Sequence, residues 1–407
     1  MRILFVHNNF PGQFKNLAPA LIERGHTVVG LTPTTNPNTI SLPAVKYTWR
    51  ERRFEAADFR LAETYAQMTR RGEAVAAVAL ELRDRHNFVP DVVFGTPGWG
   101  ETLFLRTVWP DARHLLYGEF YYGPDDPTFG FDPEFSTAST ANRIMRTAGS
   151  AHLVMASVEA DKILTPTQWQ ARSHPAFLQD RISVIHEGID TAFASPDNAA
   201  SIQIPETSHT AKAGDEILTF INRNLEPARG FHIFMRALPA VLDARPNARA
   251  VIVGGDGHSY SNPPPDGKSW KQIILDEVGD RLDMSRVHFT GKIPYRTFID
   301  LMKVTRVHAY LTYPFVLSWS MLEAMSAGAF VIGSRTPPVE EVISDGVNGQ
   351  LVDFFDVDGW SRAMIAALSK PEDFVGLREA ARRTIVERYD LRTKCLPAQL
   401  AFVETAR

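Results

Sequence analysis

Short apolar runs alternate with helical patterns along the first half of the chain. The run at residues 2–7 is typical of a buried strand, and 8–12 of a turn. An amphipathic pattern predicts a helix over 13–24 that stops at Gly25. The next apolar run, 26–32, completes a β-α-β unit, for which a parallel sheet and a right-handed crossover are expected. Further predicted elements are strands at 91–94, 113–117, 152–155 and 182–185 and a long helix over 62–86.

The second half repeats the pattern after an irregular stretch, which is rich in Ser, Thr, Pro, Asn and Ala and is interpreted as a linker. The predicted fold class is therefore α/β, with two Rossmann-like, doubly wound domains facing each other across a cleft and ligands beyond the carboxyl ends of the strands. Five strands are predicted at 217–221, 250–253, 287–290, 307–311 and 330–334. The predicted segments are a domain over 1–195, a linker over 196–213, a domain over 214–385 and a C-terminal helix over 386–407, with packing on the first domain as one option.

Length and composition narrow the possible functions. A chain of 407 residues is long enough for two cores. The net charge of −4 gives no overall attraction to nucleic acid, so an anion site has to be local. The single cysteine, Cys395, excludes an internal disulfide; with no secretory signal and no membrane-spanning run, a cytoplasmic location is expected. Twelve histidines lack metal-ligand spacing, and no G-x-G-x-x-G follows the first strand, so neither a protein-held metal nor a nicotinamide or flavin is expected.

One stretch, Tyr313–Gly328, combines an aromatic turn with a helix that stops at glycine. Ser320 and Glu323 fit the capping box S-x-x-E, in which each side chain bonds the other's backbone amide. Alternatively, the helix start holds an anion while Glu323 accepts hydrogen bonds from a vicinal diol such as a ribose. Both interpretations remain open from the sequence.

Two arginines follow the first strand of the second domain. Arg223 lies just past the strand end, and Arg229 lies at the expected start of a helix, where a cation is disfavoured without an anion nearby. Two guanidiniums converging there would suit a diphosphate. The alternative is a pair of surface arginines bonded to Glu226 and solvent.

The ordered set of motifs resembles family 4 glycosyltransferases of the GT-B fold, over most of the chain. The N-terminal counterparts are Gly12, Arg24-Gly25-His26 and His186-Glu-Gly-Ile-Asp190. The C-terminal motifs are Arg223, Arg229-Gly230, Gly254-Gly-Asp-Gly257, Phe289-Thr-Gly291, Glu323-Ala-Met-Ser-Ala-Gly328 and Asp345-Gly-Val-Asn-Gly349.

The resemblance implies roles on the donor side. Arg223 matches the phosphate-binding arginine, Arg229 stands at the usual lysine, and Glu323 matches the glutamate that binds the ribose. The family's first glutamate, eight positions earlier, is here Phe315, so we expect Ser318 or Trp319 to take over part of the sugar recognition. With these positive groups, transfer would need no metal. The expected donor-binding set is Gly12, Arg223, Arg229, Ser318, Trp319, Ser320 and Glu323.

The acceptor side is expected in the aromatic and acidic stretch Tyr117–Asp132. Glu119 is the candidate for a catalytic carboxylate, alongside Arg223 and Arg229; the alternative is that it caps a turn or pairs with an arginine. His114 is interpreted as a packing residue. Gly12 would allow close backbone approach of a ligand, or would serve only the turn. The expected acceptor-binding set is Glu119, Tyr121, Asp125 and Asp126.

Three further features stay open. Asp256 follows Gly254-Gly255 at a strand end, where a plain turn competes with a ligand contact. The long loop 258–271 could cover the donor, with no role assigned. The basic and aromatic run 47–54 would suit peripheral contact with an anionic membrane, against the alternative of a solvated helix start.

These observations predict a retaining, hexosyltransferase-like enzyme. It would move a sugar from a nucleotide-sugar to a saccharide or lipid-linked acceptor, in cell-surface polysaccharide synthesis, in the cytoplasm with possible contact at the inner membrane face. Retention and the biosynthetic context come from the resemblance. The alternatives are a GT-B nucleotide-sugar epimerase and a non-catalytic protein that binds nucleotide-sugar or glycan.

Overall fold

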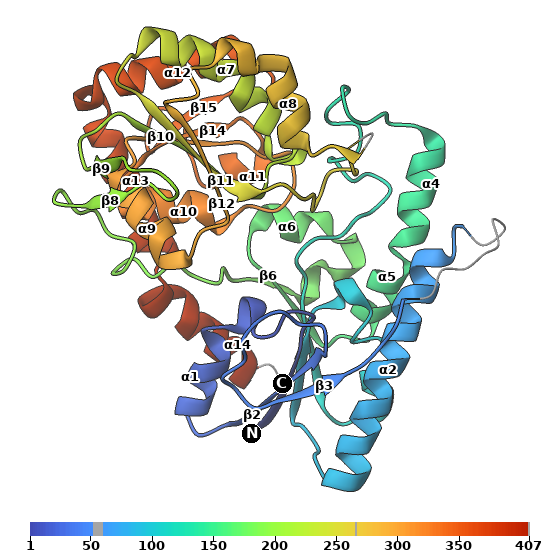
Figure 1. The fold of residues 1–407 in the computed structure, drawn as a ribbon. Coiled ribbons are helices and arrows are strands. Elements are labelled where there is room, and N and C mark those ends of the chain that lie inside the picture. Colours follow the sequence, from blue (N-terminus) through green and yellow to red (C-terminus); the bar gives the residue numbers. More distant parts are fainter. Residues whose placement is uncertain (52–59, 265–266, 406–407) are drawn as a thin grey trace. The chain divides into compact units, whose positions relative to one another are not determined.

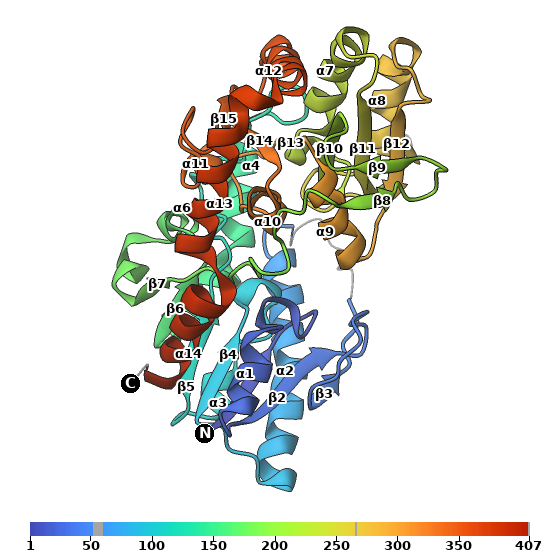
Figure 2. The ribbon, with the colours of Figure 1, turned by 90° about the vertical axis from the view of Figure 1, so that its left-hand side faces the viewer.

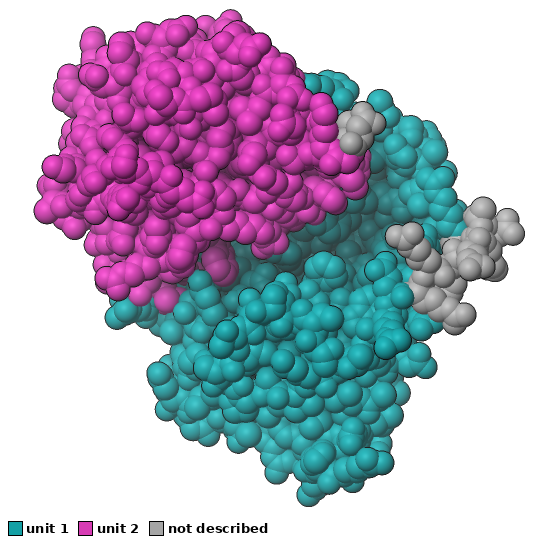
Figure 3. All heavy atoms as spheres, in the orientation of Figure 1, with its two compact units in different colours: residues 1–187, 392–407 teal, residues 188–391 magenta. Residues whose placement is uncertain are grey.

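The computed structural model of the chain describes residues 1–51, 60–264 and 267–405. The chain divides into two compact units (Figure 3). Unit 1 comprises residues 1–187 and 392–407, and unit 2 comprises residues 188–391. The sequence placed the corresponding boundaries at 195 and 385.

Unit 1, whose elements α1, α2, β2 and β3 are labelled in Figure 1, contains a seven-stranded parallel sheet with the order β3-β2-β1-β4-β5-β6-β7. The strands are β1 Arg2–Val6, β2 Thr27–Pro33, β3 Ala44–Tyr47, β4 Val92–Gly95, β5 Arg113–Tyr117, β6 Lys162–Thr165 and β7 Ile182–Val184. The helices are α1 Leu17–Glu23, α2 Glu63–His86, α3 Leu105–Val108, α4 Thr140–Gly149, α5 Ala151–Val158, α6 Gln168–Ser173 and α14 Leu396–Thr405.

The period of two along β1 explains why this sheet is covered on both faces. Ile3 and Phe5 pack in one cluster with α1 and α14, whereas Leu4 and Val6 pack in another with α2. A strand with two buried faces is apolar along its buried length, which is why residues 3–6 form a continuous apolar run.

Unit 2 repeats the design with a six-stranded parallel sheet, β12-β11-β10-β13-β14-β15 (Figure 2). The strands are β8 Ser201–Gln203, β9 Thr210–Lys212, β10 Ile217–Asn224, β11 Arg249–Gly255, β12 Val287–Gly291, β13 Val307–Tyr310, β14 Phe330–Ser334 and β15 Gln350–Val352. The helices are the 3-10 turn η5 Pro227–Arg229 and α7 Phe231–Ala244, α8 Trp270–Val278, α9 Tyr295–Val304, α10 Trp319–Ala327, α11 Pro337–Glu340, α12 Val357–Ser369 and α13 Val375–Tyr389. A π-helical turn, Leu391–Cys395, follows α13.

Both sheets have the strand order of dinucleotide-binding folds. In each, the order reverses beside the first strand, between β1 and β4 in unit 1 and between β10 and β13 in unit 2. Ligands bind beyond the carboxyl ends of strands at such a switch point. The segments after β1, β4, β10 and β13 are therefore the places to search for a site.

The structure corrects parts of the predicted pattern. Residues 152–155 form part of α5 rather than a strand, and the strand lies instead at β6, which the sequence reading missed together with β3 and β15. A four-residue apolar run fits a buried helix turn as well as a strand. The expected linker 196–213 carries the antiparallel hairpin β8-β9, and it belongs to unit 2. Gly25 ends the first helical segment at φ +84°, as predicted.

No helix in the described ranges is both long and apolar enough to cross a bilayer. The basic run 47–54 is described only up to residue 51, and its residues 52–54 lie outside the described part of the chain. Residues 265 and 266 of the loop 258–271 also lie outside it.

Candidate active site

The two arginines predicted on the donor side lie at the switch point of unit 2. Arg223 is the exposed last-but-one residue of β10, because this strand runs three residues further than predicted, so it lies within the strand rather than just past its end. Its guanidinium has no side-chain partner among the residues that the structure describes. Arg229 ends the turn η5, immediately before α7. The chain can turn there because Gly230 adopts φ +70°, and an added Cβ would lie 2.3 Å from Cβ of Leu311.

Arg229 is 6% exposed and firmly held. Its Nη1 donates to Thr312 Oγ1 at 2.7 Å and to the Val316 carbonyl at 3.0 Å. Its Cζ lies 4.9 Å from the ring centroid of Tyr260 and 5.7 Å from that of Phe315. Across the described ranges, no carboxylate forms an ion pair with it. A buried guanidinium surrounded by neutral groups is costly unless an anion joins it.

Glu226 does not pair with Arg223 or Arg229. The alternative in which both arginines bond to Glu226 is therefore wrong. This fully buried side chain points Oε2 to the backbone amides of Ser259, Tyr260 and Ser261, at 2.9, 3.0 and 2.9 Å. Three consecutive amides directed at one oxygen form an anion-binding nest. The carboxylate therefore fixes the start of the loop that the sequence left without a role.

The capping-box interpretation of Ser320 and Glu323 is also wrong. The N-cap of α10 is Ser318, whose Oγ accepts from the Ser320 amide at 3.3 Å. Glu323 lies a full turn further along the helix and accepts a 2.7 Å hydrogen bond from the Tyr295 hydroxyl. Gly328 ends the helix at φ +90°.

The remaining predicted donor residues surround the start of α10. Ser320 is buried, while Trp319 and Ser318 are half-buried, Trp319 packing on the core of unit 2. Phe315 is 6% exposed, and its ring lies 4.9 Å from that of Tyr260. Phe315 is thus a packing neighbour of Arg229.

Two tyrosines near this helix start have perturbed hydroxyls. Burial raises the pKa of Tyr310, whose oxygen accepts from the Ser318 amide at 2.8 Å. Desolvation, with the charge of Glu323 next, raises the pKa of Tyr295. Both hydroxyls therefore stay protonated at neutral pH, and Tyr295 acts as the donor toward Glu323.

In unit 1, Gly12 follows β1 at the switch point. It adopts φ +50°, and an added Cβ would lie 2.4 Å from the ring of His7. Nδ1 of His7 accepts from the Asn9 amide at 2.8 Å, and Nε2 lies 2.6 Å from Gln13 Oε1. Burial lowers the pKa of His7 to about 4, so its neutral Nε2–H donates to Gln13. The turn and the close packing both account for this glycine.

Glu119 follows β5 and is exposed. Gln13 Nε2 lies 3.5 Å from Glu119 Oε1, which links the loops after β1 and β5. The backbone carbonyl of Glu119 accepts from Gln170 Nε2 at 2.6 Å. His7 and Gln13 were missed by the sequence analysis, because a single histidine and glutamine after a strand carry no spacing signal.

The other predicted acceptor residues are held by local contacts. Asp126 Oδ1 accepts from the Thr128 amide and hydroxyl, and its Oδ2 lies 3.1 Å from Arg146. Asp125 is exposed and lies 3.6 Å from Arg143. The backbone amide of Tyr121 donates to Ser173 Oγ at 3.0 Å. Asp256, in unit 2, pairs with Lys271 at 2.9 Å.

A buried ion pair in unit 1, close to the end of β1, was not predicted. Arg71 of α2 bonds Glu101 Oε1 at 3.0 Å and the Tyr47 hydroxyl at 2.8 Å, and it also contacts Asn8. Its Cζ lies 5.6 Å from the ring of Trp99, which is 46% exposed. This arginine, unlike Arg229, has its carboxylate.

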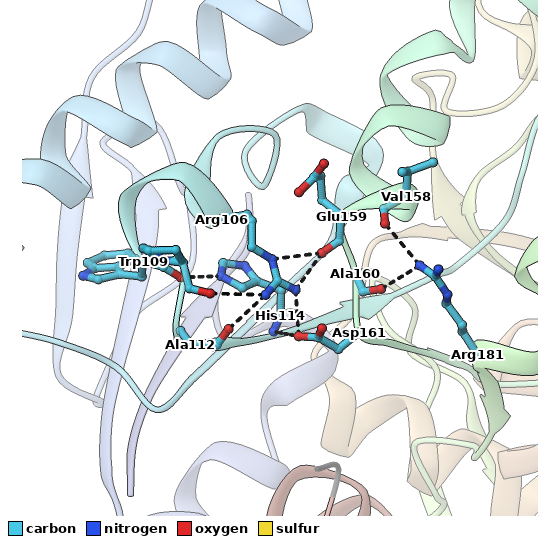
Figure 4. A network of polar contacts seen from close by, with 10 residues as sticks. Arg106, Trp109, Ala112, His114, Val158, Glu159, Ala160, Asp161 and Arg181 are labelled. Atoms are coloured by element: carbon cyan, nitrogen blue, oxygen red, sulfur yellow. Dashed lines mark hydrogen bonds and ion pairs between the residues drawn. The ribbon is translucent and has the colours of Figure 1, made fainter.

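His114 lies near the amino end of β5, an inner strand of the unit 1 sheet (Figure 4). Its ring contacts the Trp109 carbonyl at 3.0 Å, and its amide donates to Asp161, which also pairs with Arg106. A hollow of about 690 Å³ lies beside this network, near the amino ends of β5 and β6. Arg181 there donates to the carbonyls of Val158 and Ala160. His114 is thus a structural residue.

Two family models match the chain, one in each half. "Glycosyl transferase family 4 group" matches residues 24–194, and "Glycosyl transferases group 1" matches residues 205–384. The chain belongs to the family 4 glycosyltransferases. Both matched ranges contain candidate residues of the site described above.

This family 4 glycosyltransferase is similar to curated relatives named D-inositol 3-phosphate glycosyltransferase. The Corynebacterium glutamicum protein is 25% identical over 204 residues, which is 50% of this chain and 47% of the relative. The Mycobacterium avium protein is 27% identical over 239 residues, 56% of this chain and 50% of the relative. The chain therefore spans about half the length of the curated relatives it matches.

Solved structures share the fold of this glycosyltransferase over its full length. Anabaena Alr3699/HepE in complex with UDP-glucose has a TM-score of 0.67 at 14% identity, covering 100% of both chains. Sucrose-phosphate synthase from Thermosynechococcus elongatus has a TM-score of 0.71 at 16% identity, covering 99% of this chain and 98% of the other. These likenesses confirm the predicted GT-B fold.

Proposed function

We propose that this chain transfers a hexosyl group from a nucleoside-diphosphate sugar to a saccharide or lipid-linked acceptor, with retention of configuration. Cell-surface polysaccharide synthesis is the proposed context. One observation carries the donor side: Arg229 is a buried cation whose described neighbours include no paired carboxylate, at the switch point of a nucleotide-binding type of sheet. A diphosphate supplies the missing charge.

The proposed site forms from three neighbouring segments of unit 2. Arg229 and the exposed Arg223 would donate to the diphosphate oxygens, and the positive end of α10 lies at Ser318. Glu323 would accept hydrogen bonds from the ribose hydroxyls. The complexes of Anabaena Alr3699/HepE with UDP-glucose and UDP support a uridine donor as the first candidate.

The proposed reaction breaks the bond between the anomeric carbon and the diphosphate oxygen. The acceptor hydroxyl oxygen bonds to that carbon on the same face, and its proton passes to the departing phosphate. Negative charge grows on the leaving group during this step, so preorganised guanidiniums stabilise the transition state more than the ground state. The proposal includes no metal because Arg223 and Arg229 supply the positive charge.

Unit 1 is the proposed acceptor side. Glu119, oriented by Gln13, would bind an acceptor hydroxyl near the reacting centre. Tyr121 is half-buried nearby in sequence, whereas Asp126 is committed to its turn and Arg146. We therefore assign Glu119 the larger share of the acceptor contact.

A thermal-shift screen against UDP, GDP, ADP and their sugar conjugates, followed by product analysis, tests the proposal. A transferase with a suitable acceptor releases free nucleoside diphosphate, an epimerase accumulates an isomerised nucleotide-sugar, and a non-catalytic protein binds without turnover. No thermal shift with any nucleotide would contradict the donor site.

A further inference from the structure

The positive charge of Arg229 is buried and has no carboxylate partner among the described residues. Its guanidinium is 6% exposed, yet the acid closest in sequence, Glu226, uses its carboxylate elsewhere. Burial of an arginine among neutral groups has to be stabilised by precise contacts. The residues that provide those contacts determine how much positive charge the site can offer.

The loop that begins at Ser259 is bound to the segment that carries Arg229. Besides the three amide bonds to Glu226, Ser261 Oγ accepts from the Ala228 amide at 3.0 Å. Ser259 Oγ accepts from Asn224 Nδ2 at 2.6 Å. Five hydrogen bonds thus join residues 259–261 to residues 224–228, the segment that leads into Arg229.

This loop presents Tyr260 to Arg229. The Tyr260 and Phe315 rings lie 4.9 Å apart at 56°, and the guanidinium is within 6 Å of both centroids. Aromatic faces attract a cation without neutralising it, because their attraction comes from the ring quadrupole. On the other side, Thr312 Oγ1 and the Val316 carbonyl both accept from Nη1.

We propose that Glu226, Tyr260 and Phe315 are positioning residues that hold Arg229 in place while leaving its charge for the diphosphate. Glu226 acts through the loop, and the two rings act directly on the guanidinium. This inference rests on the proposed donor site. The Phe315 ring centroid lies 5.7 Å from Arg229 Cζ, so a carboxylate introduced at position 315 would be able to pair with this guanidinium.

The first test compares Phe315→Glu with Phe315→Gln, which have similar size and differ in charge. Binding of inorganic pyrophosphate and of UDP is measured by calorimetry at pH 8. We expect Phe315→Glu to bind both about tenfold or more weakly than Phe315→Gln, because a new ion pair occupies Arg229. Equal binding by the two folded variants would overturn the inference.

The second test uses Glu226→Gln, which keeps the shape of the side chain and removes its charge. Pyrophosphate affinity is measured for Glu226→Gln, Arg229→Ala and the double variant. A positioning role predicts that Glu226→Gln weakens binding severalfold when Arg229 is present and has no further effect when it is absent. Additive losses would overturn the inference, and so would unchanged binding in Glu226→Gln.

The same measurements separate this inference from the proposed function. A wild-type protein that binds neither pyrophosphate nor any nucleoside diphosphate would overturn both. The positioning roles alone would be overturned if the wild type binds these ligands, the losses from Glu226→Gln and Arg229→Ala add up in the double variant, and Phe315→Glu binds as tightly as Phe315→Gln. Unchanged thermal unfolding of Glu226→Gln would show that its effect on binding is local.

Discussion

The hydroxyl of Tyr295 on α9 donates a 2.7 Å hydrogen bond to Oε1 of Glu323 on α10. Glu323 is the residue proposed to bind the ribose, and one of its carboxylate oxygens is therefore already oriented by a tyrosine of the neighbouring helix. The role of Glu323 can be tested with two ligands, UDP and inorganic pyrophosphate, of which only UDP carries a nucleoside and hence a ribose.

Glu323→Ala should weaken UDP binding and leave pyrophosphate binding nearly unchanged, because pyrophosphate has no ribose to contact. Two hydrogen bonds to a charged group suggest a loss of about 3 to 6 kcal/mol for UDP. Calorimetry with both ligands measures the difference. Tyr295→Phe is the control, as it keeps the carboxylate and removes only its orienting partner. Equal losses for the two ligands would remove the ribose role.

Arg223→Ala should lower turnover, because its guanidinium would act on the charge of the leaving group. The expected loss is about 2 to 4 kcal/mol of transition-state stabilisation, the scale of a lost oxyanion donor. The rate of nucleoside diphosphate release measures it. The matched control is Arg362→Ala, which removes an arginine of α12 whose side chain is 71% exposed. Unchanged turnover in Arg223→Ala would exclude this residue from the mechanism.

Ser318→Ala should destabilise the start of α10 through loss of its N-cap. The expected cost is about 1 kcal/mol in the free energy of unfolding. Urea unfolding measures it, with Ser320→Ala as the comparison, since that variant keeps the Ser318 cap on the amide of residue 320. A larger loss in Ser320→Ala would restore the capping assignment that the structure overturns.

Stability should fall as the pH drops from about 6.5 toward 4. Burial lowers the pKa of His7, His174, His186 and His308 to about 4, against an ordinary value of 6.5. Between these values the unfolded chain binds more protons than the folded one, so acid favours unfolding. Each histidine contributes up to about 1.4 kcal/mol per pH unit.

Urea midpoints at pH 7 and pH 5 test this dependence. His174→Gln, which cannot titrate, should show a smaller drop between the two pH values than the wild type. An identical drop in variant and wild type would mean that His174 does not contribute.

Sequence reasoning succeeded where a local pattern decides the structure. The apolar run of β10, the glycine that ends α10 and the position of Arg229 immediately before a helix all follow from chain-local rules. It failed where contacts distant in sequence decide. Glu226 bonds to residues 259–261, which are more than 30 positions away in the chain. Tyr260, which contacts Arg229, lies in a loop without any periodic pattern that could have indicated this contact. Residues 152–155 became a helix because tertiary packing settles the state of so short an apolar run.

The packing of α14 determines when unit 1 can be finished during synthesis. Leu400, Phe402 and Val403 belong to the same core cluster as Ile3 and Phe5. Unit 2, residues 188–391, lies between these two parts of the cluster in the chain. At about 5 to 20 residues per second, the first strand waits about 20 to 80 seconds for its last helix to be synthesised. Until then, the part of this apolar sheet face that α14 covers stays exposed to water in the nascent chain.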